Sequence, residues 1–198
     1  MAIETELLVD WYWPALTGNP PPAEARTEFL TLWNAVLDKV LAMPTGWVLR
    51  DFHSPNLMWL PGRAGVRRVG ILDFQDAVEG HPAYDLVSLL QDARVDVPAG
   101  LAEKLFARYC REAAAADPGF DEEDFAFAYA ALGAQRATKI LGIFTRLSRR
   151  DGKSQYLQHI PRLWGYLEHN LRHVILRPLQ AWYDAHLPHS LRAPPSGG

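Results

Sequence analysis

The stretch over residues 47–85 constrains this chain more than any other part of the sequence. It contains three short apolar runs, and a polar residue stands at an edge of each run: Asp51, Asn56 or Asp73. Short apolar runs that are bounded by Asp, Pro and Gly predict buried strands rather than helices. A Pro-Gly turn separates the second run from the third, which indicates a hairpin. We therefore expect a small β insertion over residues 47–76 that carries these polar side chains.

The residue types at these three positions suit phosphoryl transfer. A carboxylate, an amide five residues further on and a second carboxylate across the hairpin make a set of oxygen ligands with one candidate base. Mg²⁺ prefers oxygen ligands, and the transfer needs a base within hydrogen-bond reach of the attacking hydroxyl. Asp and Asn at strand ends are also ordinary turn formers. Taken together, however, Asp51, Asn56 and Asp73 favour a site for magnesium-dependent phosphoryl transfer.

Helical periodicity governs the rest of the sequence. Apolar residues recur at intervals of three and four over residues 3–13, where a proline follows, and again over residues 22–43. Helices are predicted over residues 82–186, including a long one for which Asp121 is the expected N-cap. The sum of these patterns is an α+β fold that is mainly helical.

The same patterns define the expected domain organisation. Residues 1–192 are expected to form one domain, in which the β insertion interrupts the helices. Residues 193–198 are rich in Pro, Ser and Gly, and we expect them to form a disordered tail. The sequence contains no internal repeat.

Composition and charge exclude several classes of partner. Hydrophobic residues make up 48% of the 198 residues, which is ordinary for a soluble globular protein, and the net charge of −3 argues against a nucleic-acid partner. The single cysteine, Cys110, suits a reducing compartment, and its apolar neighbours favour a buried thiol. No apolar run reaches the ~18–20 residues of a membrane span, and the acidic N-terminus does not match a signal peptide. We therefore expect a cytoplasmic protein that binds no membrane.

Three motifs of the β insertion and the residues after it resemble a known family. Residues 50–56 are similar to the catalytic loop of the aminoglycoside phosphotransferase and choline kinase family, the small-molecule branch of the protein-kinase-like fold. Residues 71–74 resemble its metal-binding segment, and residues 82–86 resemble its D-P-x-x-D-L motif. In their residues, these segments are most similar to those of the bacterial cell-wall amino-sugar kinases. Those enzymes phosphorylate N-acetylmuramate and N-acetylglucosamine at the anomeric hydroxyl in peptidoglycan recycling.

The resemblance implies a role for each of four residues. Asp51 would be the catalytic base, Asn56 and Asp73 would bind magnesium and the nucleotide phosphates, and Asp85 would anchor the catalytic loop. It also implies ATP as the phosphoryl donor and a small-molecule hydroxyl, that of an amino sugar, as the acceptor. The implied fold is the C-terminal lobe of a protein-kinase-like fold, with the β hairpin carrying the catalytic and metal loops. Two alternatives stay open: phosphorylation of an aminoglycoside antibiotic, and a non-catalytic kinase-like binding domain.

Residues 1–46 differ from what this family has before its catalytic loop. The family has a five-stranded N-terminal lobe there, with a loop that covers the phosphates and a lysine that pairs with them. Here two helices are predicted, no glycine-rich loop is present, and Lys39 falls in a helical pattern. Leu49 also stands where the family usually has His. We therefore expect that the nucleotide-clamping lobe is absent and that the chain, as a truncated form, has little activity alone.

Three further residues are weaker candidates for contact with the substrate. His53 could contact the acceptor or a phosphate, or it could support the loop by packing. Asp76 could face the substrate or cap its own loop. Arg136 lies on a predicted helical face, where it could bind a substrate carboxylate such as the lactyl group of muramate, or lie in solvent. The histidines show no zinc-binding spacing.

Overall fold

The structure is a computed structural model that describes residues 2–195. It confirms a mainly helical α+β chain, with short strands in antiparallel pairs. The residues divide into two compact units. The first, here called the helical unit, contains the residues up to Ala42 and those from Ala130 onward, and the second, here called the mixed unit, is Met43–Tyr129. Among the described residues, no helix combines the length and the hydropathy that a membrane span requires.

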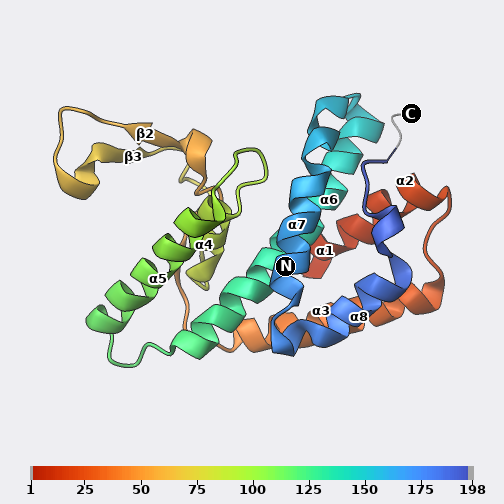
Figure 1. The fold of residues 1–198 in the computed structure, drawn as a ribbon, viewed down its shortest axis with the longest axis horizontal. Helices are drawn as coiled ribbons and strands as arrows, with labels where there is room; N and C mark the ends of the chain where they lie inside the picture. Colours follow the sequence, from red (N-terminus) through yellow and green to blue (C-terminus); the bar gives the residue numbers. More distant parts are fainter. Residues whose placement is uncertain (1, 196–198) are drawn as a thin grey trace. The chain divides into compact units, whose positions relative to one another are not determined.

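The helical unit is built from helices that bury aromatic side chains. Phe29 and Trp33 of one helix and Tyr183 of another are fully buried. The helices that carry them, α3 and α8, lie side by side (Figure 1). The helices of this unit are α1 (Ala2–Leu7), α2 (Trp13–Thr17), α3 (Ala23–Leu41), most of α6 (Glu122–Asp151), α7 (Ile160–Leu171) and α8 (Arg177–His186), with 3₁₀ turns at Ser154–His159, Val174–Leu176 and His189–Leu191.

The first helical run differs from the sequence prediction because it passes through Pro14 and ends at Thr17. A proline inside an α-helix removes one backbone hydrogen bond, and its ring clashes with the carbonyl four residues earlier. Here a π-helical turn, Leu8–Tyr12, separates α1 from α2, and the backbone N–H of Trp13 donates to the carbonyl of Leu8, five residues back. Pro14 then falls in the first turn of α2, where a missing N–H does no harm.

The mixed unit contains all four strands and two complete helices. Strand β1 pairs with β4, and β2 pairs with β3, both antiparallel. The second pairing is the predicted hairpin, whereas β4 was not predicted from the sequence. The elements of this unit are β1 (Gly46–Val48), β2 (Leu57–Trp59), β3 (Val69–Ile71), β4 (Val78–Gly80), α4 (Ala83–Leu90), α5 (Ala99–Ala116) and the first turns of α6, with 3₁₀ turns at Ser54–Asn56 and Gly65–Arg68.

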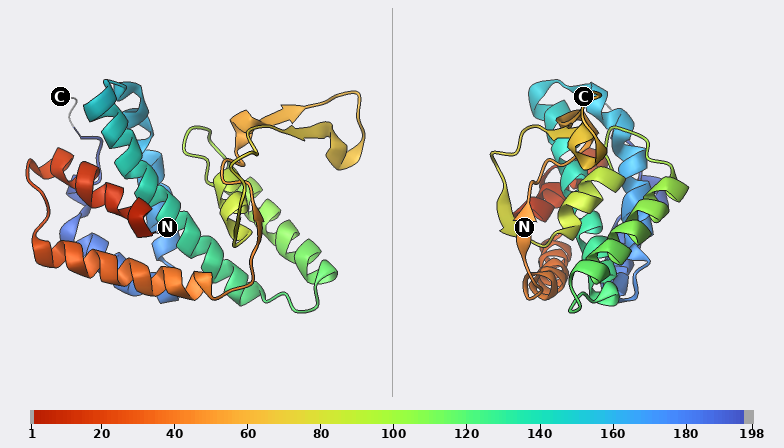
Figure 2. Two further views of the ribbon diagram at one scale, coloured as in Figure 1. Left: turned by 180° about the vertical axis from the view of Figure 1, so that it is seen from behind. Right: turned by 90° about the vertical axis from the view of Figure 1, so that its left-hand side faces the viewer.

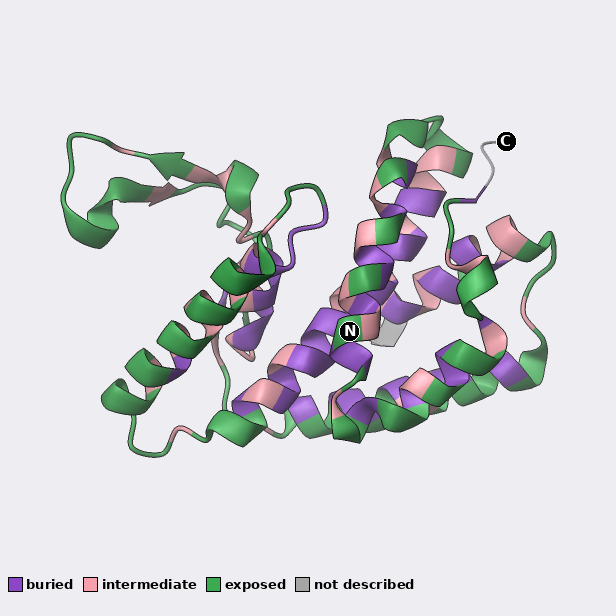
Figure 3. Cartoon of the chain, in the orientation of Figure 1, coloured by how far each residue is buried: buried purple, intermediate pink, exposed green. Residues whose placement is uncertain are grey.

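The prediction that these strands are buried was wrong for the hairpin. Trp59 in β2 and Ile71 in β3 are exposed, and the whole β2–β3 ribbon is coloured as exposed or intermediate (Figure 3). The ribbon extends beyond α4 as a two-stranded hairpin (Figure 2, left). Two strands cannot bury their own faces, because burial requires a further packed layer. The apolar residues of the hairpin were therefore a guide to strand pairing and not to burial.

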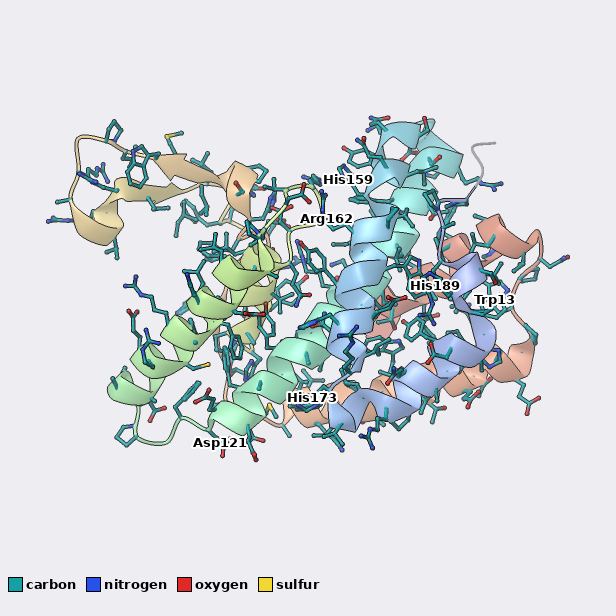
Figure 4. The ribbon with its side chains drawn as sticks, in the orientation of Figure 1. Trp13, Asp121, His159, Arg162, His173 and His189 are labelled. Carbon is teal, nitrogen blue, oxygen red and sulfur yellow. The ribbon has the colours of Figure 1, made fainter. Side chains whose placement is uncertain are left out.

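The core of the mixed unit forms where α5 meets the start of α6. Asp121 caps α6, since its carboxylate accepts a hydrogen bond of 2.9 Å from the backbone N–H of Asp124, as predicted (Figure 4). One turn on, Phe125 is buried and stacks on Tyr109, with 4.9 Å between ring centroids. Cys110 is buried beside this cluster, which confirms the expectation of a buried thiol, and burial raises the pKa of that thiol.

The predicted tail is described only in part. Residues 196–198 lie outside the described residues. The carbonyl of Ala193 accepts a hydrogen bond of 3.0 Å from the hydroxyl of Tyr12 in the helical unit. The tail therefore begins with a residue that is bonded to the helical core.

Candidate active site

The loop that follows β1 is held by the carboxylate of Asp85. This residue lies in the first turn of α4. Its carboxylate accepts hydrogen bonds from the backbone N–H groups of Leu49, at 2.7 Å, and Arg50, at 3.0 Å. Bonds from one carboxylate to two consecutive N–H groups fix the path of the backbone just before Asp51. The geometry makes Asp85 an anchor for the loop.

Backbone strain marks both ends of the candidate site. Among the described residues, the two non-glycine residues with positive φ are Arg50, at 69°, and Asp73, at 58°. The left-handed region disfavours side chains that carry a Cβ, although Asp tolerates it better than most residues. Such residues persist only where their surroundings hold them, and they cluster at functional sites. Arg50 immediately precedes Asp51, so the strain lies next to the candidate base.

The amide of Asn56 is the centre of the polar cluster. Its Nδ2 donates to the backbone carbonyl of Asp51 at 3.0 Å and lies 3.4 Å from both Nε2 of His53 and Oδ2 of Asp73. The carbonyl of Asn56 also accepts a bond of 2.9 Å from the N–H of Leu72, which extends the β2–β3 pairing by one residue. The structure therefore brings four of the predicted residues, Asp51, His53, Asn56 and Asp73, into one cluster.

Asp73 stands just past the end of β3 with its carboxylate in a polar setting. One oxygen accepts a hydrogen bond of 2.5 Å from the side-chain amide of Gln75, and the other faces Asn56. The side chains of Asp51 and Asp73 are both exposed. A ligand from solvent can therefore reach both carboxylates without displacing packed side chains.

The surroundings of Asn56 and Asp73 fit a magnesium ion by their donor chemistry. Mg²⁺ takes oxygen ligands, keeps several waters, and is usually held by one or two carboxylates together with substrate phosphates. An amide and a carboxylate that lie side by side match that description. Among the described residues, no three His, Cys, Asp or Glu side chains gather into a metal-binding group, so a cage made entirely of these ligands is not found there.

The remaining candidates do not join the cluster. Asp76 is exposed and has no contact with it among those found in the described residues. Arg136 belongs to the helical unit, whereas the cluster belongs to the mixed unit. Arg136 is half-buried and is therefore not fully solvated. Its neighbour on that helical face, Lys139, forms an ion pair of 2.5 Å with Glu4.

Sequence reasoning missed Asp92, a buried carboxylate that faces the candidate loop. Its Oδ2 lies 3.9 Å from Nδ1 of His53. An aspartate two residues after the apolar helix Ala83–Leu90 was the available signal, because an acid at the end of a buried element must find donors.

Comparison with known proteins identifies the family of the chain. Residues 4–127 match the family described as the phosphotransferase enzyme family. An N-acetylmuramate/N-acetylglucosamine kinase of Caulobacter vibrioides is 42% identical over 190 residues, which cover 95% of this chain and 51% of that protein. Proteins with the same name from Neisseria meningitidis and Pseudomonas aeruginosa are 38% and 37% identical, over 91% and 83% of this chain and 54% and 48% of their own lengths.

The matches cover more of this chain than of the relatives. The chain spans about half the length of the curated relatives that it matches. The family match, in contrast, covers well over half of the chain, and it includes the loops that carry Asp51, Asn56 and Asp73. The chain therefore belongs to the phosphotransferase enzyme family.

Proposed function

We propose that this chain is the part of an ATP-dependent amino-sugar kinase that carries the catalytic base and the metal ligands. The observation that carries the proposal is the cluster in which Asn56 contacts the backbone of Asp51 and the carboxylate of Asp73. The names of the relatives supply the substrate class, N-acetylmuramate or N-acetylglucosamine. The fold that goes with this proposal is the C-terminal lobe of a protein-kinase-like fold over residues 1–192, with its catalytic and metal loops beside the hairpin.

In this proposal Asp51 acts on the acceptor. Its exposed carboxylate accepts the proton of the sugar hydroxyl as that oxygen forms a bond to the γ-phosphorus of ATP, and the bond to ADP breaks. By resemblance to the amino-sugar kinases, the hydroxyl is the anomeric one. Asp85 maintains the position of Asp51 through its bonds to the preceding two N–H groups. Misplacing a reacting group by about 1 Å costs roughly 100-fold in rate, so this anchoring matters to turnover.

Asn56 and Asp73 would hold the magnesium ion. When bound there, the ion supplies charge neutralisation on the phosphates. The two side chains supply one neutral and one charged oxygen ligand, and Gln75 keeps the Asp73 carboxylate in place through a hydrogen bond of 2.5 Å. A neutral amide avoids adding a third negative charge next to Asp51 and Asp73.

We further propose that residues beyond these 198 grip the nucleotide. The described part of the first 42 residues contains helices α1, α2 and α3 and no strand, so it supplies no strand-borne lysine. The chain alone should therefore bind ATP weakly and turn over slowly. Supplying the part of the Caulobacter relative that this chain does not span should raise the rate. The ATP supply of the cytoplasm makes that compartment the expected place of action.

Substitution of Asp51 tests the proposed chemistry. Asp51→Asn should lower kcat by about 10²–10⁴-fold, the usual contribution of a general base, with little change in the KM for the sugar. The assay measures ADP release with N-acetylglucosamine, for the chain supplied with the missing part of the Caulobacter relative. Glu103→Gln, which removes a charge from the exposed face of α5, is the control. Near-normal turnover of Asp51→Asn would disprove the assignment of the base.

A further inference from the structure

The proposed chemistry leaves one buried acid of the mixed unit without a role. Asp92 follows α4 and is only 3% exposed. Its Oδ1 accepts hydrogen bonds from the backbone N–H groups of Arg94, at 2.8 Å, and Val95, at 3.2 Å. Its Oδ2 is also buried, and it forms no hydrogen bond with the described residues. Burying a carboxylate oxygen without a donor costs free energy, so this oxygen needs an explanation.

The imidazole of His53 faces that oxygen. Nδ1 of His53 lies 3.9 Å from Oδ2 of Asp92, and the histidine side chain is 14% exposed. At this distance the contact is electrostatic, and it acts in a buried setting where screening by water is weak. A lone pair on Nδ1 would be repelled by the carboxylate, whereas an N–H there is attracted. The carboxylate therefore favours the tautomer with its hydrogen on Nδ1.

The other ring nitrogen faces the amide of Asn56. Nε2 of His53 lies 3.4 Å from Nδ2 of Asn56. The same Nδ2 faces two further acceptors, the carbonyl of Asp51 at 3.0 Å and the carboxylate of Asp73 at 3.4 Å. An amide nitrogen only donates, so a ring with its hydrogen on Nδ1 and its lone pair on Nε2 offers a third acceptor to the two hydrogens of this nitrogen. The two neighbouring contacts of His53 thus favour the same tautomer.

We propose that Asp92 and His53 are positioning residues for Asn56. Asp92 holds His53 with its hydrogen on Nδ1, and Nε2 of His53 accepts from the amide of Asn56. The amide nitrogen is then committed to the protein, and the amide oxygen is the atom left to meet the metal ion. The inference rests on the proposed function, because it explains how Asn56 becomes an oxygen ligand rather than presenting its nitrogen.

The tautomer of His53 can be measured directly in the full 198-residue chain. Long-range ¹H–¹⁵N NMR at about pH 8, above the ordinary range of imidazole titration, distinguishes a hydrogen on Nδ1 from one on Nε2. The expected result is the Nδ1–H form, with His53→Gln used to assign the signals. A hydrogen on Nε2 would overturn the proposal. This result does not depend on catalysis, so it stands apart from any failure of the proposed function.

Asp92→Asn tests the link between Asp92 and the tautomer of His53, because it replaces the oxygen that faces the ring with an NH₂ donor. Oδ1 of Asp92 receives two backbone N–H groups, so the amide oxygen of the new side chain should take that place and its NH₂ should face His53. The ring should then carry its hydrogen on Nε2, which repels the amide of Asn56. An unchanged tautomer in a folded variant would contradict the proposal, and the spectrum of the original chain decides the matter if the variant does not fold.

The consequence for metal binding is measured with Mn²⁺ alone. Paramagnetic broadening of the Asn56 and Asp73 signals should need about tenfold more Mn²⁺ in Asp92→Asn, the usual size of effects that act through a neighbour of a metal ligand. Glu103→Gln serves as the control and should leave the titration unchanged. Equal titrations for Asp92→Asn and the original chain would contradict the positioning role. If the original chain has the expected tautomer but Asn56→Ala leaves Mn²⁺ binding intact, the proposed function fails instead.

Discussion

Polar side chains are arranged in opposite ways in the helical unit and in the loops around Asn56. In the helical unit, buried polar groups form hydrogen bonds with one another. The hydroxyls of Thr138 and Tyr183 lie 2.7 Å apart, and Nε1 of Trp164 donates to the hydroxyl of Tyr12 at 2.8 Å. Around Asn56, the carboxylates of Asp51 and Asp73 are exposed. Polar groups that satisfy one another inside a core specify a structure, whereas carboxylates that face solvent are available to a ligand.

The backbone shows the same contrast. In the mixed unit, the two non-glycine residues with positive φ, Arg50 and Asp73, lie in the polar loops. In the helical unit, close packing is achieved with a small residue instead: a Cβ placed on Gly142 of α6 would lie 2.3 Å from the carbonyl of Leu7. The comparison predicts that changes in the helical unit alter stability, and that changes around Asn56 alter chemistry before they alter stability.

The largest effect on stability is expected from Gly142→Ala. The added methyl group cannot fit against the backbone of Leu7, so α1 or α6 must shift. We expect the free energy of unfolding to fall by about 3 kcal/mol, the upper end of the usual cost of overpacking. Urea denaturation followed by circular dichroism measures the change.

Gly165→Ala is the matched control for that substitution. Gly165 lies in α7, and a Cβ there would meet nothing within 4 Å. Alanine is the better helix former by about 0.5–1 kcal/mol, so this variant should be more stable than the original chain. If both variants lost equal stability, the tight contact between α1 and α6 would not be the cause.

The next effect concerns Asp85, a residue whose bonds should affect both the stability of the chain and the position of Asp51. Asp85→Ala leaves the N–H groups of Leu49 and Arg50 without their acceptor, which should cost about 2 kcal/mol. Hydrogen exchange at these two amides should accelerate more than at amides of α8. Asp85→Asn retains one accepting oxygen, so the exchange rate at these two amides should lie between those of the original chain and of Asp85→Ala. Unchanged exchange at Leu49 in Asp85→Ala would show that the loop is held by something else.

A smaller effect is expected from Arg192, which ties the end of the helical unit to its core. Its side chain is 10% exposed, and its guanidinium forms ion pairs of 2.8 Å with Glu168 and 2.5 Å with Asp184. Arg192→Ala should lower the free energy of unfolding by about 1.5 kcal/mol and leave phosphoryl transfer unchanged. Arg108→Ala, which breaks an exposed pair with Glu112, should cost only about 0.3–0.5 kcal/mol. Equal losses in a thermal melt would contradict this ranking.

The smallest effect is a pH dependence from His81 in the mixed unit. Burial lowers the pKa of His81, an effect that the nearby Asp124 carboxylate only partly opposes. The unfolded chain therefore binds a proton more readily than the folded chain. The contribution of His81 to stability is complete above the ordinary pKa of 6.5 and is lost as the pH falls through that value toward the lower pKa of the folded chain.

His81→Asn isolates this contribution. Nδ1 of His81 accepts a hydrogen bond of 3.3 Å from the N–H of Ala83, and the side-chain oxygen of asparagine can accept it without titrating. The variant should lose less stability than the original chain between about pH 7 and pH 5. Parallel stability curves for the two proteins would show that the burial of His81 does not govern this window.

Much of the secondary structure could be predicted from local patterns. Helical periodicity located the helices, the side chain of Asp121 indicated the start of α6, and the Pro-Gly turn indicated the pairing of β2 with β3. These features depend on residues close together in the sequence. The π-turn before Pro14, strand β4 and the exposure of the hairpin could not be found in this way, because each depends on what packs against the segment.

The candidate site shows the same division. Asp51, Asn56 and Asp73 were found because their types and spacing resemble a family motif, and the structure brings them together. Asp92 belongs to no motif of the sequence, and only the folded chain places it opposite His53. The roles of all these residues stay predictions until they are measured.

The most direct test of the account is transfer of a radioactive γ-phosphoryl group from ATP to an amino sugar. The chain is supplied with the part of the Caulobacter relative that it does not span, and N-acetylmuramate, N-acetylglucosamine, choline and kanamycin are compared as acceptors with magnesium present. We predict a labelled sugar phosphate with either N-acetyl sugar, formed about 10²–10⁴-fold more slowly after Asp51→Asn. Labelling of kanamycin in place of the sugars, or sugar labelling at a near-normal rate after Asp51→Asn, would contradict this prediction.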